Sequence, residues 1–212
     1  MRISLREREK AAKAVEVAAK MILEGHVIAY PTETTYGLGA DATNVAAVKK
    51  VFEIKARDAD RAMPVIVSDL RMAKEFAEIG PIAEHLANAF MPGPLTIIVE
   101  KKAIIPDAVS RHGIAFRIPS NYIARGIASQ ANKPLIATSA NISGSPPVVR
   151  EADLIEQFDG KVSLIVATGD LISMPPSTVI DVRTLPIKLL RPGPTPFSEV
   201  EAELKKFAPA AP

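Results

Sequence analysis

Short apolar runs are the feature of this sequence that most limits its fold. They span four to six residues each, at 27–30, 64–67, 95–99, 113–118, 135–138 and 163–167, with two more near 178–182 and 187–190. Runs of this length that are rich in β-branched residues predict buried strands. Longer amphipathic stretches predict helices at 6–24, 45–55, 69–78, 81–90, 122–131 and 150–158. Because hairpin-length links alternate with helical crossovers, we expect an α/β fold with a twisted mixed sheet and helices packed on it.

Composition narrows the class of protein. The 212 residues are 48% hydrophobic and 24% charged, which suits one compact domain with a sizeable core. Cysteine is absent, which excludes disulfides, thiolate catalysis and cysteine-ligated zinc. Residues 1–10 are charged and helical in character, unlike a signal peptide, and no window approaches the ~18 apolar residues of a membrane span. We therefore expect a soluble, cytoplasmic protein whose last residues, from Lys205 on, form a frayed tail.

The stretch 30–44 (YPTETTYGLGADATN) follows the first predicted strand and is rich in hydroxyl groups. We expect it to be a polar loop and not a core element, because so many polar side chains need hydrogen-bond partners. Residues 37–42 match the dinucleotide fingerprint G-x-G-x-x-A, but a polar segment separates them from the strand. The fingerprint requires its glycines at the strand-to-helix turn itself, so we take the match as accidental. No P-loop or nucleophile-elbow motif is present.

Cations stand at the ends of several predicted elements. Lys55 and Arg57 end a helix, where favourable interaction with the helix dipole is a sufficient explanation. Arg117 interrupts an apolar strand, so either it is partly buried and needs an anionic partner, or it points to solvent. Arg191, and the pair Ser139 and Asn141, also follow strands. Polar groups at several strand ends predict a polyanion site assembled across the sheet.

Seven segments occur in one order along the chain: 31–39 (PTETTYGLG), 55–57 (KAR), 92–96 (PGPLT), 115–119 (AFRIP), 138–144 (TSANISG), 177–181 (STVID) and 190–193 (LRPG). Together they resemble the threonylcarbamoyl-AMP synthase (YrdC-like) family, over roughly residues 10–195. The resemblance implies a twisted α/β sheet around a large open cavity. It also implies one YrdC-like catalytic domain at 1–200 and a tail at 201–212.

The activity implied by the resemblance is a nucleotidyltransferase. L-threonine, bicarbonate and ATP would give threonylcarbamoyl-AMP and pyrophosphate, and a separate transferase complex would use that product to modify adenosine in tRNA. Threonine carbamate is itself the nucleophile, so catalysis consists of positioning two anions and stabilising phosphate charge. Mg²⁺ is expected as a cofactor through the ATP phosphates, without a metal site on the protein.

The resemblance also assigns roles to residues. Lys55, Arg57 and Arg117 are the expected catalytic cations, and Ser139, Asn141 and Arg191 join them in binding the nucleotide. The side chains expected to line the threonine and carbamate pocket are Thr32, Thr35, Tyr36, Thr138 and Ser177. Glu33 would either pair with a cation or orient the substrate ammonium.

Two positions depart from the family pattern. Ser68 stands where several relatives have a histidine, and Asp58 follows Arg57 in place of a frequent proline, which changes the course of the chain to Arg61. Two other functions are also considered. One is a double-stranded RNA-binding module without catalysis, against which the net charge of only +2 argues. The other is a carbamoyl-transfer domain like that of hydrogenase maturation proteins, whose zinc-finger and acylphosphatase modules are not found in this sequence.

Overall fold

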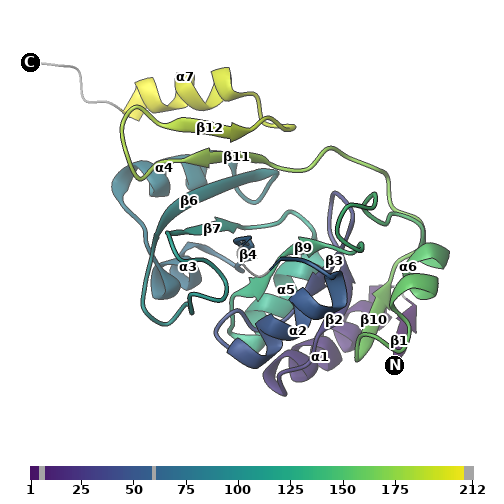
Figure 1. Ribbon diagram of the computed structural model, residues 1–212. Helices are drawn as coiled ribbons and strands as arrows, with labels where there is room; N and C mark the ends of the chain where they lie inside the picture. The colour runs from purple at the N-terminus through teal and green to yellow at the C-terminus, as the bar shows by residue number, and fades with distance from the viewer. Residues whose placement is uncertain (5–7, 59–60, 208–212) are drawn as a thin grey trace, which may run out of the picture.

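The computed structural model describes residues 1–4, 8–58 and 61–207. Within them the chain forms two β-sheets with helices packed against both (Figure 1). The helices are α1 (Arg8–Leu23), α2 (Val45–Lys55), α3 (Leu70–Phe76), α4 (Pro81–Phe90), α5 (Tyr122–Ala131), α6 (Glu151–Phe158) and α7 (Phe197–Phe207). The strands are β1 (Arg2–Ser4), β2 (Ile28–Pro31), β3 (Tyr36–Gly39), β4 (Val65–Ile66), β5 (Ala77–Glu78), β6 (Leu95–Lys101), β7 (Ile114–Arg117), β8 (Leu135–Ile136), β9 (Thr138–Ser139), β10 (Leu164–Ala167), β11 (Thr178–Asp181) and β12 (Lys188–Arg191).

The first sheet has the strand order β1-β10-β2-β3-β9. β1, β10 and β2 run parallel, whereas β3 is antiparallel to both β2 and β9. Its central strands are buried on both faces, as their unbroken apolar runs predict. A tight hairpin joins β2 to β3, and its turn, residues 32–35, lies at one end of the sheet.

The second sheet has the order β12-β11-β6-β7-β4-β8, with β5 paired to β6. It combines the parallel pairs β11–β6 and β4–β7 with antiparallel neighbours. The connection from β10 in the first sheet to β11 in the second, residues 168–177, crosses from one sheet to the other as the long arc in Figure 1. The expected mixed α/β architecture is therefore confirmed, with two sheets in place of one.

The stretch expected to be a polar loop is the main error of the sequence-based prediction. Residues 36–39 form β3, in which all four residues are buried. The glycines make this burial feasible, because a Cβ on Gly39 would lie 2.6 Å from Cε1 of the buried Tyr30 ring. Gly37 and Gly39 thus lie within an antiparallel strand and not at a strand-to-helix turn, which confirms that the dinucleotide match is accidental.

Both ends of the chain also differ from expectation. Residues 2–4, expected to be helical, form β1, because their backbone completes the parallel edge of β10. Residues 201–207 of the expected tail are helical: they belong to α7, which packs on α4 and contains the fully buried Val200. Residues 208–212 of that tail lie outside the described residues, and the domain boundary at 200 stays a prediction. Among the helices of the described residues, none is both long and apolar enough to cross a membrane.

Candidate active site

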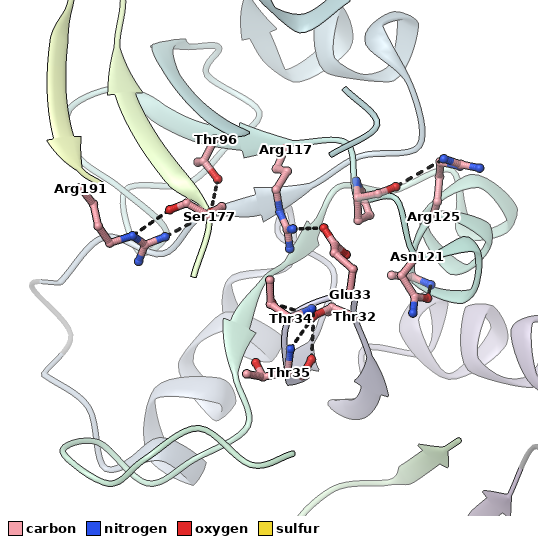
Figure 2. A network of polar contacts seen from close by, with 12 residues as sticks. Thr32, Glu33, Thr34, Thr35, Thr96, Arg117, Asn121, Arg125, Ser177 and Arg191 are labelled. Atoms are coloured by element: carbon pink, nitrogen blue, oxygen red, sulfur yellow. Dashed lines mark hydrogen bonds and ion pairs between the residues drawn. The ribbon is translucent and has the colours of Figure 1, made fainter. Parts of the chain in front are cut away.

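A buried ion pair joins the two sheets. Arg117 ends β7, is only 8% exposed, and donates from Nη1 to Oε1 of Glu33 on the 32–35 turn. Figure 2 shows the guanidinium reaching from the second sheet to this turn. The anionic partner expected for a buried Arg117 is therefore present, and the solvent-facing alternative is wrong. Of the two roles considered for Glu33, the structure shows pairing with a cation.

The 32–35 turn is held by the hydroxyl of Thr32. Thr32 Oγ1 donates to the carbonyl of Thr35 at 2.6 Å and accepts from the N–H groups of Thr34 and Thr35 at 3.2 Å each. A side chain that satisfies three backbone groups in this way fixes a turn without regular secondary structure. Glu33 is consequently presented to Arg117 by a rigid turn.

Two atoms beside the pair are buried without a hydrogen-bond partner in the described structure: Tyr30 Oη and Glu33 Oε2. Burial raises the pKa of Tyr30 above its usual value, against the opposing effect of the Arg117 charge. The phenol therefore stays neutral at physiological pH. Sequence reasoning did not include Tyr30 among the polar groups of the site.

A second arginine lies beside this pair, at the end of β12. Arg191 donates from Nε to the Ser177 carbonyl at 3.0 Å and from Nη2 to Ser177 Oγ at 3.1 Å. Burial and the nearby charge of Arg117 both lower the pKa of Arg191. Ser177 Oγ also lies 2.8 Å from Oγ1 of Thr96, a β6 residue that is 3% exposed. Figure 2 shows two interactions at neighbouring strand ends: Arg191 of β12 contacts Ser177, which precedes β11, and Arg117 of β7 contacts Glu33.

The buried Lys55 organises the loop after β9. Its Nζ donates to the Ser139 carbonyl at 2.5 Å, the Asn141 carbonyl at 2.8 Å and Asn141 Oδ1 at 2.9 Å. Ser139 Oγ donates to the same Oδ1, so the ammonium ties down both expected nucleotide-binding side chains. Burial, with a smaller effect from the charge of Arg57, lowers the pKa of Lys55 to about 8. The ammonium is therefore charged at pH 7, and all three of its hydrogens are used inside the protein.

Arg57 lies just beyond the end of α2 and is half-buried. Its Nη2 donates to the Ala62 carbonyl at 3.0 Å, while its buried Nε has no partner in the part of the chain that is described. Burial and the charge of Arg61 lower the pKa of Arg57, which places Arg61 close to it. Neighbouring cations of this kind repel one another and gain stability from a bound anion.

The remaining expected pocket residues take different positions. Tyr36 is fully buried, and its hydroxyl donates to the Gly169 carbonyl at 2.6 Å and accepts from Thr168 N–H at 3.0 Å, which anchors the start of the 168–177 connection. Thr138 lies on β9 opposite Leu38 of β3 and is 7% exposed. Ser68 precedes α3, where its hydroxyl contacts Asp69 at 3.4 Å.

The expected residues therefore fall into neighbouring groups along the sheet ends. One contains Arg117, Arg191 and Ser177, and the other contains Lys55, Ser139 and Asn141. The 32–35 turn lies between them, because Glu33 pairs with Arg117 while Tyr36, next along the chain, accepts at its carbonyl from Ala140 N–H. Sequence reasoning gave Thr96 no role, although the motif 92–96 already contained it. Within the described residues, no group of three or more acidic or histidine side chains could hold a metal ion.

Two open mixed sheets that bring the buried Arg117 and other arginines near hydroxyl-rich segments define an α/β protein suited to binding anionic oxygens. The chain belongs to the Sua5/YciO/YrdC family, whose model, described as "Telomere recombination", matches residues 20–193.

Named relatives support this assignment. The chain is 39% identical over 202 residues to a threonylcarbamoyl-AMP synthase of Pyrococcus abyssi, covering 94% of this chain and 59% of the relative. It is 36% identical over 194 residues to a putative threonylcarbamoyl-AMP synthase of Methanocaldococcus jannaschii, with 91% of each chain covered. The crystal structure of Pyrococcus abyssi Sua5 complexed with L-threonine superimposes with a TM-score of 0.88 at 38% identity, covering 96% of this chain and 61% of that one. This chain thus spans about three fifths of the length of the Pyrococcus relative.

Proposed function

We propose that this protein is a threonylcarbamoyl-AMP synthase, which converts L-threonine, bicarbonate and ATP into threonylcarbamoyl-AMP, pyrophosphate and water. The observation that carries the proposal is the convergence of Arg117 and Arg191 beside the threonine-rich 32–35 turn. Two arginines whose positive charges act on the same region favour a ligand with more than one negative charge. The names of the relatives that match most of this chain point to the same reaction.

The reaction requires positioning and not a protein nucleophile. The threonine amine combines with bicarbonate to give a carbamate and water. A carbamate oxygen then attacks the α-phosphorus of ATP, and the bond to the β-phosphate oxygen breaks to release pyrophosphate. Both reactants are anions, so side-chain cations must offset their repulsion and the charge that develops at phosphorus.

The contacts of each cation indicate which part of this charge neutralisation and positioning it performs. Arg117 and Arg191 supply positive charge from the second sheet, each already oriented by a protein acceptor. Lys55 acts by holding the Ser139–Asn141 loop in place for the nucleotide, because its own hydrogens are committed there. Arg57, whose buried Nε lacks a partner among the described residues, is the cation best placed to take up a further phosphate oxygen.

Mg²⁺ fits this proposal as part of the substrate. The site is lined by cations and hydroxyls, so the metal would be held by the phosphate oxygens of ATP and would help to neutralise their charge. Thr32, Thr35, Tyr36 and Thr138, together with Ser177, are proposed to form the threonine side of the site. The hydroxyls of Thr32 and Tyr36 donate to backbone carbonyls, and these contacts hold this side of the site in place.

The proposed product is an activated carbamoyl adenylate, which supports a role in threonylcarbamoyl modification of tRNA together with a transferase complex, in the cytoplasm. Direct binding of tRNA or double-stranded RNA stays a separate expectation. The net charge of only +2 and the pairing of Arg117 with Glu33 between the two sheets favour catalysis over a purely RNA-binding role.

The test is threonine-dependent release of pyrophosphate. Purified protein with Mg-ATP, bicarbonate and L-threonine should release pyrophosphate and form threonylcarbamoyl-AMP, detected by mass spectrometry. Arg117→Ala should lower kcat/KM by about 100-fold, the typical effect of losing one charge-stabilising donor. Lys49→Ala, on the exposed face of α2, is the control and should keep wild-type activity. Absence of threonine-dependent release would refute the proposed reaction, and equal activity of the two variants would show that the role given to Arg117 is wrong.

A further inference from the structure

The hydroxyl of Ser177 is surrounded in a way that fixes which hydrogen bonds it can still make. Ser177 directly precedes β11 of the second sheet and is 8% exposed. A Cβ on Gly193 would lie 2.5 Å from the Pro176 carbonyl oxygen and 2.7 Å from the Ser177 carbonyl carbon. The backbone at Ser177 therefore packs closely against the Arg191–Gly193 segment on one side and lies beside β6 on the other.

The acceptor capacity of Ser177 Oγ can be counted. A serine hydroxyl has one hydrogen and two lone pairs. One lone pair accepts from Arg191 Nη2 at 3.1 Å. The contact with Thr96 Oγ1 at 2.8 Å uses either the second lone pair or the hydrogen.

Burial of Thr96 decides between these two arrangements. Ser177 Oγ is the partner of the Thr96 hydroxyl in the described structure, and Thr96 is 3% exposed. If Ser177 donated, the Thr96 hydrogen would be buried without an acceptor, at a cost typical of an unmade hydrogen bond. If Thr96 donates, its own hydrogen is satisfied, and the hydrogen of the 8% exposed Ser177, which has no acceptor among the described residues, is left for a bound ligand.

We propose that Thr96 is a positioning residue that makes Ser177 an obligate hydrogen-bond donor toward an anionic oxygen of the substrate. With both lone pairs occupied, Ser177 Oγ can only donate, next to the guanidinium of Arg191. A donor beside a cation selects a phosphate or carboxylate oxygen and rejects a group that itself offers a hydrogen. This inference rests on the proposed function for the identity of the ligand, but the hydrogen-bond pattern does not.

The test uses variants that distinguish the effect of the Thr96 hydroxyl from the effect of the side-chain volume. Thr96→Val removes the hydroxyl at nearly constant volume, and Thr96→Ser keeps it. Dissociation constants for L-threonine and for Mg-pyrophosphate, measured separately by calorimetry, report binding without turnover. KM and kcat are measured in parallel.

We expect Thr96→Val to weaken binding of one of the two ligands by about 10- to 100-fold, in line with one hydrogen bond to a charged group. Thr96→Val should raise KM more than it lowers kcat, whereas the dissociation constants and KM of Thr96→Ser should stay within about twofold of wild type. In the Ser177→Ala background, Thr96→Val should have no further effect, because the two hydroxyls act through one another. Weakened threonine binding assigns the anionic oxygen to a carboxylate, and weakened pyrophosphate binding assigns it to a phosphate.

Unchanged affinity for both ligands in Thr96→Val, or fully additive effects of Thr96→Val and Ser177→Ala, would overturn the proposal. Thr43→Val removes another threonine hydroxyl, bonded to Asp41 at 2.6 Å and away from this cluster, and controls for general loss of stability. If Thr96→Val does not fold, Thr96→Ala takes its place in the same comparisons. A wild-type protein that binds threonine but releases no pyrophosphate would refute the proposed reaction and leave the Thr96 assignment to be decided by the binding data.

Discussion

Neutralising Glu33 tests how strongly the two sheets depend on their shared ion pair. The Glu33→Gln substitution keeps the shape of the side chain but leaves the Arg117 charge without its counterion. The side chains of Arg117 and Glu33 are 10% and 15% exposed, so water screens little of the lost attraction. Removing one partner of a buried pair costs about 3–5 kcal/mol. Because the amide carbonyl introduced by this substitution can still accept from Arg117, we expect a loss near the lower end, about 3 kcal/mol.

The double variant distinguishes this explanation from simple loss of packing. Glu33→Gln combined with Arg117→Met removes both charges, so it should be more stable than Glu33→Gln alone. Urea unfolding followed by circular dichroism gives the free energies of unfolding. Glu84→Gln, which breaks the exposed Lys74–Glu84 pair, is the matched control and should leave the unfolding midpoint unchanged.

Adding an anion extends the same experiment to the site. Pyrophosphate replaces the missing negative charge beside Arg117, so it should stabilise Glu33→Gln more than the wild type. Equal stabilisation of the two proteins would show that Arg117 does not face the anion. A Glu33→Gln protein within about 1 kcal/mol of wild type would show that the pair contributes far less than burial implies.

Three further substitutions follow from the described contacts. Burial lowers the pKa of Lys55 from 10.5 to about 8, so the folded protein releases this proton at a lower pH than the unfolded chain does. Relative to Lys55→Met, the free energy of unfolding of the wild type should therefore rise between pH 8 and 10.5, by at most about 3 kcal/mol. Urea titrations at each pH measure this rise, and parallel pH profiles of the two proteins would contradict it. Gly39→Ala places a carbon 2.6 Å from the Tyr30 ring and should lower the free energy of unfolding by about 2 kcal/mol, while Gly80→Ala, which meets nothing within 4 Å, should be close to neutral. Tyr30→Phe removes a buried hydroxyl without a partner in the described structure, so thermal unfolding should show equal or higher stability; a loss above about 1 kcal/mol would reveal a bridging partner.

The sequence was most informative where burial and charge conflict. An arginine inside the apolar run 113–118 must either find an anion or face solvent, so the need for a partner of Arg117 could be stated in advance. The identity of that partner was left open, because Glu33 was expected either to pair with a cation or to orient the substrate ammonium, and neither alternative named Arg117. The mixed sheet followed from the alternation of hairpin-length links with helical crossovers.

The sequence was least informative where tertiary contacts override local pattern. β3 is built from glycines and hydroxyl-bearing neighbours, and it is a strand because β2 and β9 flank it and the Tyr30 ring covers Gly39. Thr96 and Ser177 come from distant segments, and only the parallel pairing of β6 with β11 brings them together. α7 carries a clear apolar face, yet its position near the chain end favoured a tail over a helix.

The order in which the site residues occur along the chain has a consequence for synthesis. The 32–35 turn and Arg117 are made well before β11 and Arg191, which complete the site. Parallel pairing of β11 with β6 requires a long loop to close first, a slow step in folding. A nascent chain arrested before Arg191 therefore has Arg117 but lacks the second arginine of the site. Affinity for a polyanion should rise once Arg191 has been made and β11 has paired with β6, so it can serve as a readout of cotranslational folding.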